Sequence, residues 1–337
     1  MKLHRHKSFA CIRVVLASLL AFGVFGAGCA TRTPSEATEP RDYQDTTPRL
    51  AIISAFEPEL EKLRGAAKIA EIRIFNGRSY YLGRLNGKDV VMLLSGISMV
   101  NAALTTQNLL DHFTVREIVF SGIAGGVNPN LNVGDVTVPA EWGEYQEQLF
   151  ARETADGWDA GRSGSEFPNY GMMFPRSVKV TRRDGPVDQP EPRFWFSADP
   201  EGIKTVRRIA DRVKLSRSTD DGQSLSVEPQ IIAGGKGVSG PTFVDNAAYR
   251  QWVWQTFQAD ALDMETAAVA QVAYVNQVPF IAFRSLSDLA GGGGGKNESS
   301  VFFKLAADNS AAVVLAYVQA FGEKTANESE PHKDLSH

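Results

Sequence analysis

Cysteine is scarce in this chain of 337 residues, which contains only Cys11 and Cys29. Cys11 lies in a basic and then apolar N-terminal segment of the kind that signal peptidases remove. A mature chain would therefore keep Cys29 alone, and a single cysteine cannot form an internal disulfide.

An excess of charge of either sign is also missing. The chain has 35 Lys and Arg residues against 39 Asp and Glu residues, for a formal net charge of -4. Proteins that bind nucleic acids carry a basic surface, so we expect no nucleic acid partner. The 43% hydrophobic content and the length instead fit a globular protein.

The N-terminal segment lacks an apolar run long enough to cross a bilayer. Residues 14–25 are mostly apolar and follow four basic residues, Lys2, Arg5, Lys7 and Arg13. Such a run is too short for a spanning helix but fits the hydrophobic region of a signal peptide. We therefore interpret residues 1–28 as a signal peptide and expect an exported protein.

Small residues at positions 26–28 directly precede Cys29. This segment resembles the bacterial lipobox, in which cleavage leaves the cysteine as a lipidated N-terminus. Gly26 differs from the usual leucine-like residue, and the alternative is ordinary cleavage that leaves a soluble periplasmic protein with a free thiol. Ala30 replaces the aspartate that often marks inner-membrane retention, which favours an outer-membrane anchor facing the periplasm or the cell surface.

Polar segments flank a single predicted domain at residues 49–325. Residues 29–48 and 326–337 are predicted to be a disordered tether and a disordered tail. Apolar runs typical of buried strands occur at residues 50–56, 89–94, 117–121, 135–139, 229–233 and 279–284. Helical patterns alternate with them, at residues 57–63, 101–113, 202–213, 246–257, 265–275 and 300–321. This alternation predicts an α/β fold built in layers.

Residues 142–223 interrupt the alternation. They are rich in Gly, Pro, Arg and Asp, with scattered aromatic residues. Structureless stretches of this length are unusual inside a compact domain, so we expect part of the segment to be an ordered insertion. The composition does not distinguish a lid over a site from a contact between subunits.

Two acidic residues near the C-terminal end are predicted to meet. Glu265 stands at the start of a predicted helix, and Asp288 follows the buried run at residues 279–284. Open α/β sheets bind ligands in a crevice at the carboxyl ends of their strands. Two carboxylates in different surroundings there can take different roles, one as a bound anion and the other as a proton carrier.

Six short segments carry a resemblance to a known family. They occur in the family's order, at residues 51–59, 95–97, 121–126, 133–136, 263–268 and 284–288. With them, residues 50–321 resemble the nucleoside phosphorylase/nucleosidase superfamily, and most closely the bacterial 5′-methylthioadenosine/S-adenosylhomocysteine nucleosidases. The resemblance implies a three-layer αβα fold with a central mixed sheet, a homodimer, and a reaction that uses neither a cofactor nor a metal.

The resemblance also implies catalytic roles for two carboxylates. Enzymes of this kind hydrolyse the N-glycosidic bond of a purine nucleoside, with 5′-methylthioadenosine or S-adenosylhomocysteine as the first candidates here. Asp288 matches the general acid that protonates purine N7, which requires a raised pKa. Glu59 matches the glutamate that orients and deprotonates the attacking water, for which Glu57 is the weaker candidate.

Further residues match the family's substrate contacts. Glu265 matches the carboxylate that binds the ribose 2′ and 3′ hydroxyls, and Met264 matches the residue that packs on the sugar. Phe243 matches the aromatic residue that stacks on the base, whose edge the backbone of Val244 reads. The remaining implied contacts come from Ser287, Phe56 and Ile123.

Each assignment has a simpler alternative. Glu59 by itself is typical of a solvated charge at a helix N-terminus, and Asp288 is typical of a turn cap. Met264 and Phe243 by themselves are typical of a hydrophobic core. Their joint occurrence in the family's order favours the functional interpretation.

The predicted nucleophile is water rather than phosphate. Phosphorylases of the bacterial purine type hold phosphate with an arginine and a hydroxyl residue, at positions where this chain has Phe120 and Ile123. Apolar side chains cannot compensate the dehydration of a phosphate dianion, which needs charged hydrogen-bond donors. A purine nucleoside phosphorylase remains the enzymatic alternative.

Three departures set the chain apart from the family pattern. Ser98 and Met99 replace a common Gly-Lys pair, Asp263 replaces a glutamate, and residues 291–295 are consecutive glycines. The glycines predict a flexible flap and lack the residue order of a nucleoside triphosphate loop. Two non-enzymatic alternatives stay open, a storage or binding protein of the same fold and a surface adhesin or ligand sensor.

Overall fold

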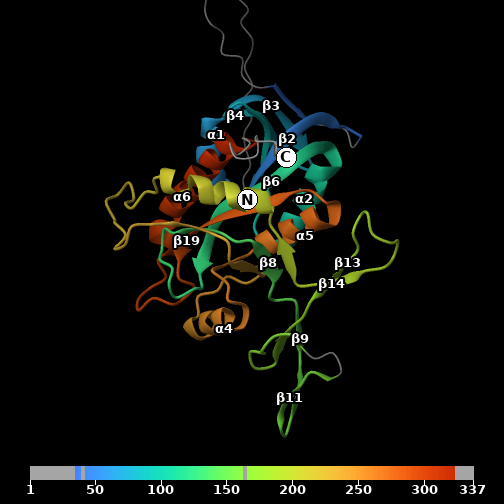
Figure 1. Ribbon diagram of the computed structural model, residues 1–337, viewed down its shortest axis with the longest axis vertical. Helices are drawn as coiled ribbons and strands as arrows, with labels where there is room; N and C mark the ends of the chain where they lie inside the picture. Colours follow the sequence, from blue (N-terminus) through green and yellow to red (C-terminus); the bar gives the residue numbers. More distant parts are fainter. Residues whose placement is uncertain (1–34, 39–41, 162–164, 323–337) are drawn as a thin grey trace, which may run out of the picture. The chain divides into compact units, whose positions relative to one another are not determined.

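The computed structural model describes residues 35–38, 42–161 and 165–322 (Figure 1). The predicted signal peptide, Cys29, part of the predicted tether and the predicted tail from residue 326 lie outside the described residues. The helices are α1 (Glu57–Ala66), α2 (Met99–His112), α3 (Pro200–Ile209), the short 3-10 helix η2 (Ala210–Arg212), α4 (Ala247–Phe257), α5 (Thr266–Asn276) and α6 (Ser299–Ala320).

Most strands join one sheet of 13 strands. Its members are β1 (Ser35–Thr38), β2 (Asp45–Ser54), β3 (Lys68–Phe75), β4 (Arg78–Leu85), β5 (Lys88–Leu94), β6 (Phe113–Gly126), β7 (Val136–Val138), β8 (Glu141–Glu144), β15 (Trp195–Ser197), β16 (Ile231–Ala233), β17 (Lys236–Ser239), β18 (Ala261–Asp263) and β19 (Phe280–Asp288). At its centre, β6 pairs in parallel with β2 and β19 and antiparallel with β18. The predicted mixed sheet is therefore confirmed.

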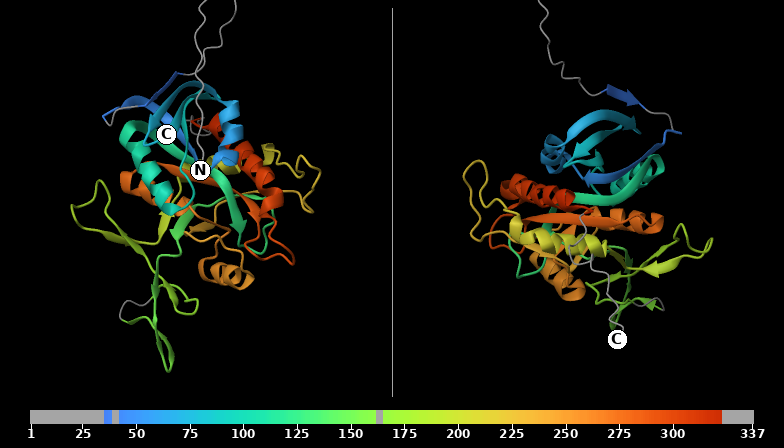
Figure 2. Two further views of the ribbon diagram at one scale, coloured as in Figure 1. Left: turned by 180° about the vertical axis from the view of Figure 1, so that it is seen from behind. Right: turned by 45° about the horizontal axis from the view of Figure 1, so that its top comes forward.

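Helices cover both faces of the sheet, as Figures 1 and 2 show. Val206 of α3 and Val314 of α6 share one buried cluster with Ile52 of β2. Leu109 of α2 and the small residues of α5 share a second cluster with the next residue, Ile53. Successive strand residues point to opposite faces, so the two clusters are the two interfaces of a three-layer αβα fold.

Helix α6 is long and apolar enough by length and composition to cross a membrane. Its apolar side chains are mostly buried within the protein, as they are in the core helix of a layered fold.

The apolar runs of the sequence did not predict strands β3 and β4. Two Asn-Gly turns build this part of the sheet, and in both turns Asn and Gly have positive φ: Asn76 (51°), Gly77 (72°), Asn86 (48°) and Gly87 (77°). Two consecutive residues with positive φ fit the tight hairpin turn that matches strand twist. The Asn-Gly pairs were the sequence signal for these hairpins.

The ordered chain begins earlier than the predicted boundary at residue 49. Strand β2 starts at Asp45. Strand β1 lies inside the predicted tether and pairs in parallel with β3. Asp45 accepts hydrogen bonds from the backbone N–H of Thr47 (2.8 Å) and from Nε of Arg49 (2.8 Å). The polar residues at the start of β2 are therefore hydrogen-bonded to one another. The prediction of a disordered tether used composition alone and did not include these bonds.

The insertion is narrower than the predicted residues 142–223. Strands β8 and β15 pair antiparallel in the main sheet, and α3 packs in the helical layer, so the excursion lies between β8 and β15. It forms three small two-stranded sheets that extend from the body in Figure 1, built from β9 (Gln148–Phe150) with β12 (Met173–Pro175), β10 (Arg152–Thr154) with β11 (Gly157–Asp159), and β13 (Val178–Val180) with β14 (Glu191–Arg193). The base of the insertion packs against α4 through an aromatic cluster that includes Tyr145, Phe194, Trp252 and Phe257.

Glu117 of β6 is a buried acid at the opposite end of that strand from Gly126, and it predicts a pH-dependent stability. Its carboxylate is 1% exposed and accepts hydrogen bonds from the hydroxyl of Tyr317 (2.9 and 2.8 Å). Burial, with a smaller contribution from Asp199, raises the pKa of Glu117 to about 8. A folded-state pKa above the unfolded value means that stability is complete below the unfolded pKa and falls as the pH rises toward 8.

We therefore expect Glu117→Gln to raise the free energy of unfolding at pH 8 by about 1 kcal/mol or more, because one pKa unit corresponds to roughly 1.4 kcal/mol. At pH 4, below the unfolded-state pKa, the variant should gain nothing. Urea unfolding of both proteins at the two pH values measures the difference, and an identical pH dependence in the variant would refute this account.

Candidate active site

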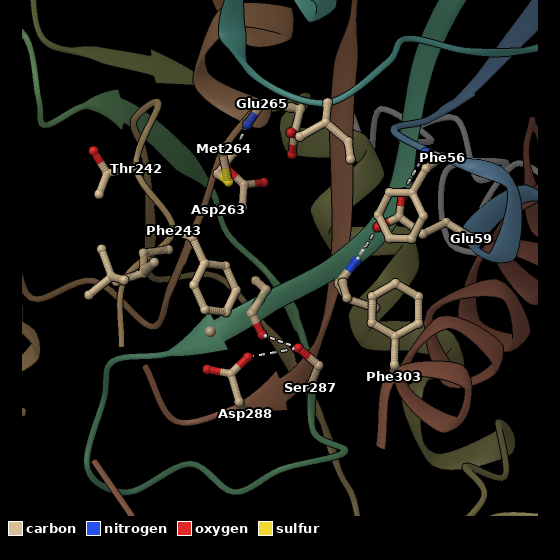
Figure 3. A pocket seen from close by; sticks show the side chains of 16 residues that line it. Phe56, Glu59, Thr242, Phe243, Asp263, Met264, Glu265, Ser287, Asp288 and Phe303 are labelled. Atoms are coloured by element: carbon tan, nitrogen blue, oxygen red, sulfur yellow. Dashed lines mark hydrogen bonds between the residues drawn. The ribbon is translucent and has the colours of Figure 1, made fainter. Parts of the chain in front are cut away.

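A pocket of about 260 Å³ opens at the carboxyl ends of β6, β18 and β19 (Figure 3). All nine residues that the sequence proposed for catalysis or substrate contact line it: Phe56, Glu59, Ile123, Phe243, Val244, Met264, Glu265, Ser287 and Asp288. Seven lining residues were not proposed: Ile97, Ala124, Gly125, Thr242, Leu262, Asp263 and Phe303. None of the described residues of the segment 142–223 lines this pocket.

Glu59 reaches the pocket from the first turn of α1. Its carboxylate accepts hydrogen bonds from the backbone N–H groups of Ala55 (2.7 Å), Phe56 (3.4 Å) and Ile123 (2.9 Å). The residue is 2% exposed, so it is not the solvated helix-start charge of the simpler alternative. Burial raises the pKa of Glu59, although Arg284 and the three N–H donors act in the opposite direction. Glu57 is exposed and pairs with Arg64.

Arg284 of β19 lies fully buried beneath the pocket. Its Nε donates to Oδ2 of Asp263 (2.6 Å) and to Oγ1 of Thr266 (3.0 Å), and its guanidinium lies 4.1 Å from the centre of the Phe120 ring. Nη1 and Nη2 have no hydrogen-bond partner among the described residues. An added Cβ at Gly122 would lie 2.0 Å from Nη1 of Arg284 and 2.5 Å from Oε1 of Glu59. The missing side chain of Gly122 therefore leaves the space in which the guanidinium approaches Glu59.

Glu265 stands between β18 and α5 at the other wall. Its Oε1 accepts a hydrogen bond from the backbone N–H of Ser98 (2.6 Å), and the residue is 7% exposed. Burial, followed by the charge of Asp263, raises the pKa of Glu265 to about 7, against the opposing effect of Arg284. At neutral pH this carboxyl is therefore close to half protonated and responsive to a ligand.

Asp288 ends β19. Its Oδ1 accepts a hydrogen bond from the backbone N–H of Ala290 (2.7 Å), and its Oδ2 accepts one from the hydroxyl of Ser287 (2.9 Å). Asp288 thus does cap a turn, as the simpler alternative has it, and it also faces the pocket. Burial raises the pKa of Asp288, although each of these donors favours the ionised form.

Apolar side chains form the rest of the wall. Figure 3 shows Phe56, Glu59 and Phe303 on one side and Thr242 and Phe243 on the other. The rings of Phe56 and Phe303 lie 5.0 Å apart. Phe243 is 62% exposed and Met264 is half-buried, so neither is an ordinary core residue.

The described residues contain no group of three or more His, Cys, Asp or Glu side chains arranged to hold a metal ion.

The fold and the order of these residues place the chain in a known class. It matches the phosphorylase superfamily over residues 49–319 and belongs to that family. Among its relatives, the 5′-methylthioadenosine/S-adenosylhomocysteine nucleosidase of Geobacillus sp. (strain WCH70) is 31% identical over 273 residues, which cover 81% of this chain and 98% of the relative. The nucleosidase of Geobacillus kaustophilus (strain HTA426) is 30% identical, with coverage of 82% and 99%.

Solved structures agree with the fold. The 5′-methylthioadenosine/S-adenosylhomocysteine nucleosidase of Neisseria meningitidis, in complex with methylthio-immucillin-A, has a TM-score of 0.60 and 28% identity, covering 82% of this chain and 99% of its own. The nucleosidase of Colwellia psychrerythraea 34H, in complex with adenine, has a TM-score of 0.60 and 27% identity, with coverage of 82% and 96%. The predicted three-layer fold and the predicted family are both confirmed.

Ser98 predicts a local gain in stability from a single substitution. It has φ 78° and ψ 157°, a region that residues other than glycine rarely adopt, and this backbone aims its N–H at Glu265. We expect Ser98→Gly to raise the free energy of unfolding by about 1 kcal/mol, since such strain costs on the order of 1–3 kcal/mol.

Thermal or urea unfolding measures the gain, and Ser98→Ala is the matched control because it removes the hydroxyl but keeps Cβ. An equal gain in both variants would show that the hydroxyl, rather than the backbone, is the source of the strain.

Proposed function

We propose that this protein is a purine nucleosidase that hydrolyses the N-glycosidic bond of a 5′-thioadenosine, with 5′-methylthioadenosine or S-adenosylhomocysteine as the substrate. The observation that carries the proposal is the convergence of Glu59, Glu265 and Asp288 from three separate elements on one pocket. The names of the relatives, each a 5′-methylthioadenosine/S-adenosylhomocysteine nucleosidase, support the substrate class.

Asp288 is the general acid in this proposal. N-glycosidic cleavage leaves positive charge on the ribosyl group, and the departing purine must gain a proton, for which N7 is available. A carboxyl group can supply that proton near neutral pH only if its pKa is raised. Burial of Asp288 at the end of β19 raises its pKa in this way.

Glu59 and Arg284 prepare the attacking water. Glu59 has a carboxylate oxygen beside the unpartnered Nη1 of Arg284, at the space left by Gly122. A water on the pocket side of Glu59 would donate a hydrogen bond to its carboxylate and accept one from the guanidinium of Arg284, which orients a lone pair of the water toward the anomeric carbon. Arg284 was not proposed from the sequence, and its unsatisfied donors are what identify it.

In this proposal, Glu265 and Met264 contact the sugar, and the apolar part of the wall contacts the 5′ group. Glu265 has a second carboxylate oxygen, besides the one bonded to Ser98, for a ribose hydroxyl, while Met264 lies beside it as an apolar contact. Phe56 and Phe303 line the pocket beside Glu59, and Ile97 is a further apolar lining residue. An apolar surface suits a thioether substituent better than a free 5′ hydroxyl.

The same wall favours water over phosphate. Among its 16 described lining residues are four carboxyl groups, those of Glu59, Asp263, Glu265 and Asp288, and no Lys, Arg or His. The buried Arg284 is already paired with Asp263. A phosphate dianion in this pocket would face net negative charge without a free cation.

The apolar N-terminal part of α2 supports a homodimer. Val100 and Leu104 are 80% and 64% exposed, and Ile97, which also lines the pocket, is 53% exposed. Exposed apolar patches of this kind mark protein contacts. We propose that a second copy covers this face and closes the pocket beside Ile97. Sedimentation velocity should show a dimer for the parent and a monomer for Leu104→Asp, and a monomeric parent would overturn the proposal.

For the location of the protein, we propose export and lipidation at Cys29, supported by the basic and apolar composition of residues 1–28 and the small residues before the cysteine. The mass of the N-terminal peptide from membrane-extracted protein tests this, because an unmodified Cys29 or a retained leader would contradict it.

Purified mature protein should release free adenine from 5′-methylthioadenosine at the same rate with and without inorganic phosphate. Adenosine, inosine and S-adenosylhomocysteine complete the panel, and chromatography of the free base measures the release. A strict requirement for phosphate would establish the phosphorylase alternative, whereas binding without turnover would establish the storage or sensor alternative.

Asp288→Asn is the matched variant for that assay. It keeps the shape of the side chain but removes the proton, and we expect kcat to fall by about 100-fold or more, the usual contribution of a general acid. Full activity of this variant would refute the acid assignment while leaving the hydrolase proposal intact.

A further inference from the structure

The glycine segment between β19 and α6 has two different halves. An added Cβ at Gly291 would lie 2.4 Å from the backbone N of Asn246, and one at Gly292 would lie 2.6 Å from Nη1 of Arg250. An added Cβ at residues 293–295 would meet nothing within 4 Å. Gly291 is therefore needed for close packing against the backbone before α4, and Gly292 lies against the side chain of Arg250, whereas the last three glycines span open space.

Asn297 fixes the far end of this segment with three hydrogen bonds. Its Nδ2 donates to Oδ1 of Asp245 (3.0 Å) and, over a longer distance, to Oδ1 of Asp288 (3.5 Å). Its Oδ1 accepts from the backbone N–H of Ser299 (2.9 Å), at the start of α6. Ionised carboxylates only accept and the backbone N–H only donates, so this set of partners determines which end of the amide faces the carboxylates.

We propose that Asn297 is a positioning residue for Asp288. The Asn297 amide joins the general acid to the loop of Val244 and Asp245, which lies against the base, and it directs the acid proton to Oδ2. This inference rests on the proposed function. Asp245 directly follows Val244 of the pocket wall, so the amide bridges the two sides of the base site. Without the bridge, two carboxylates would face each other with no donor between them.

The placement of the proton follows from the donors around Asp288. Oδ1 receives the N–H of Ala290 and the amide of Asn297, so a proton on that oxygen would displace them. Oδ2 receives only the hydroxyl of Ser287, which has the carbonyl oxygen of Ala124 as another acceptor at 3.4 Å. When Oδ2 is protonated, the Ser287 hydroxyl can donate to Ala124 instead, which leaves the acid proton free for the departing base.

The amide favours the ionised form of Asp288, so its removal raises the pKa of that carboxyl. Because the proposed acid works protonated, a higher pKa moves the alkaline limb of kcat to higher pH. The loss of the bridge also loosens the acid, which lowers the plateau of kcat. A residue that merely begins α6 would affect folding stability and would leave this pH limb unchanged.

Asn297→Ala removes the amide donor without adding a charge and should move the alkaline limb in the same direction. Its partner variant is Asn297→Asp, which keeps an acceptor for the N–H of Ser299 but replaces the donor with a negatively charged carboxylate. Assayed on 5′-methylthioadenosine across pH, it should show a plateau kcat about tenfold below the parent, as for a modestly misplaced catalytic group. Its alkaline limb should lie at higher pH. Gly294→Ala is the control, since residue 294 faces open space, and it should keep the parent's plateau and limb.

A second readout does not depend on turnover. Carbon NMR titration of the side-chain carboxyl of Asp288 in the ligand-free protein, assigned with Asp288→Asn, should show a higher pKa in Asn297→Asp than in the parent. An unchanged titration together with unchanged kinetics would overturn the role of Asn297. An inactive parent would refute the proposed hydrolase, and the titration would still decide whether Asn297 controls Asp288.

Discussion

The buried ion pair between Arg284 and Asp263 is the interaction on which the rest of the site depends. It joins β19 to β18, its guanidinium lies over Phe120 of β6, and Thr266 at the start of α5 completes the contact. Removing one member of such a pair leaves an uncompensated buried charge, which typically costs about 3–5 kcal/mol. The pair therefore holds three strands and one helix in the register that places the other carboxyl groups.

One guanidinium cannot neutralise all the carboxyl groups around it. Arg284 faces Asp263, Glu59 and Glu265, so its single positive charge offsets only part of the negative charge of these groups. Burial raises the pKa of Glu59 and Glu265, and separately that of Asp288 farther along β19. Carboxyl groups with raised pKa values can bind hydroxyls, orient water or release a proton, which are the three tasks of N-glycoside hydrolysis.

The insertion and the glycine segment at residues 291–295 lie outside the described wall of the pocket. The insertion between β8 and β15 packs its aromatic base on α4 and contributes nothing to the pocket wall. The glycine segment is different, because its end reaches Asp288 through Asn297. A change in the length or composition of the glycine segment is therefore expected to alter the position of Asp288. A change in the insertion is expected to alter the packing against α4.

Local pattern was sufficient for much of this protein. Apolar runs and helical periodicity predicted the central strands and most helices. Six short segments in order predicted the family and seven of the nine lining residues, and the match of residues 240–244 added Phe243 and Val244. These predictions were possible because buried strands and close ligand approach restrict composition locally. The Asn-Gly turns of β3 and β4 also carried a signal, although β-hairpins with polar faces hide it from an argument based on apolar runs. The strained backbone of Ser98, the unpartnered guanidinium of Arg284 and the bridge from Asn297 to Asp245, 52 residues away in sequence, were decided only by the tertiary structure. Each depends on which distant groups the packed layers bring within hydrogen-bond distance, and spacing along the chain does not encode that distance.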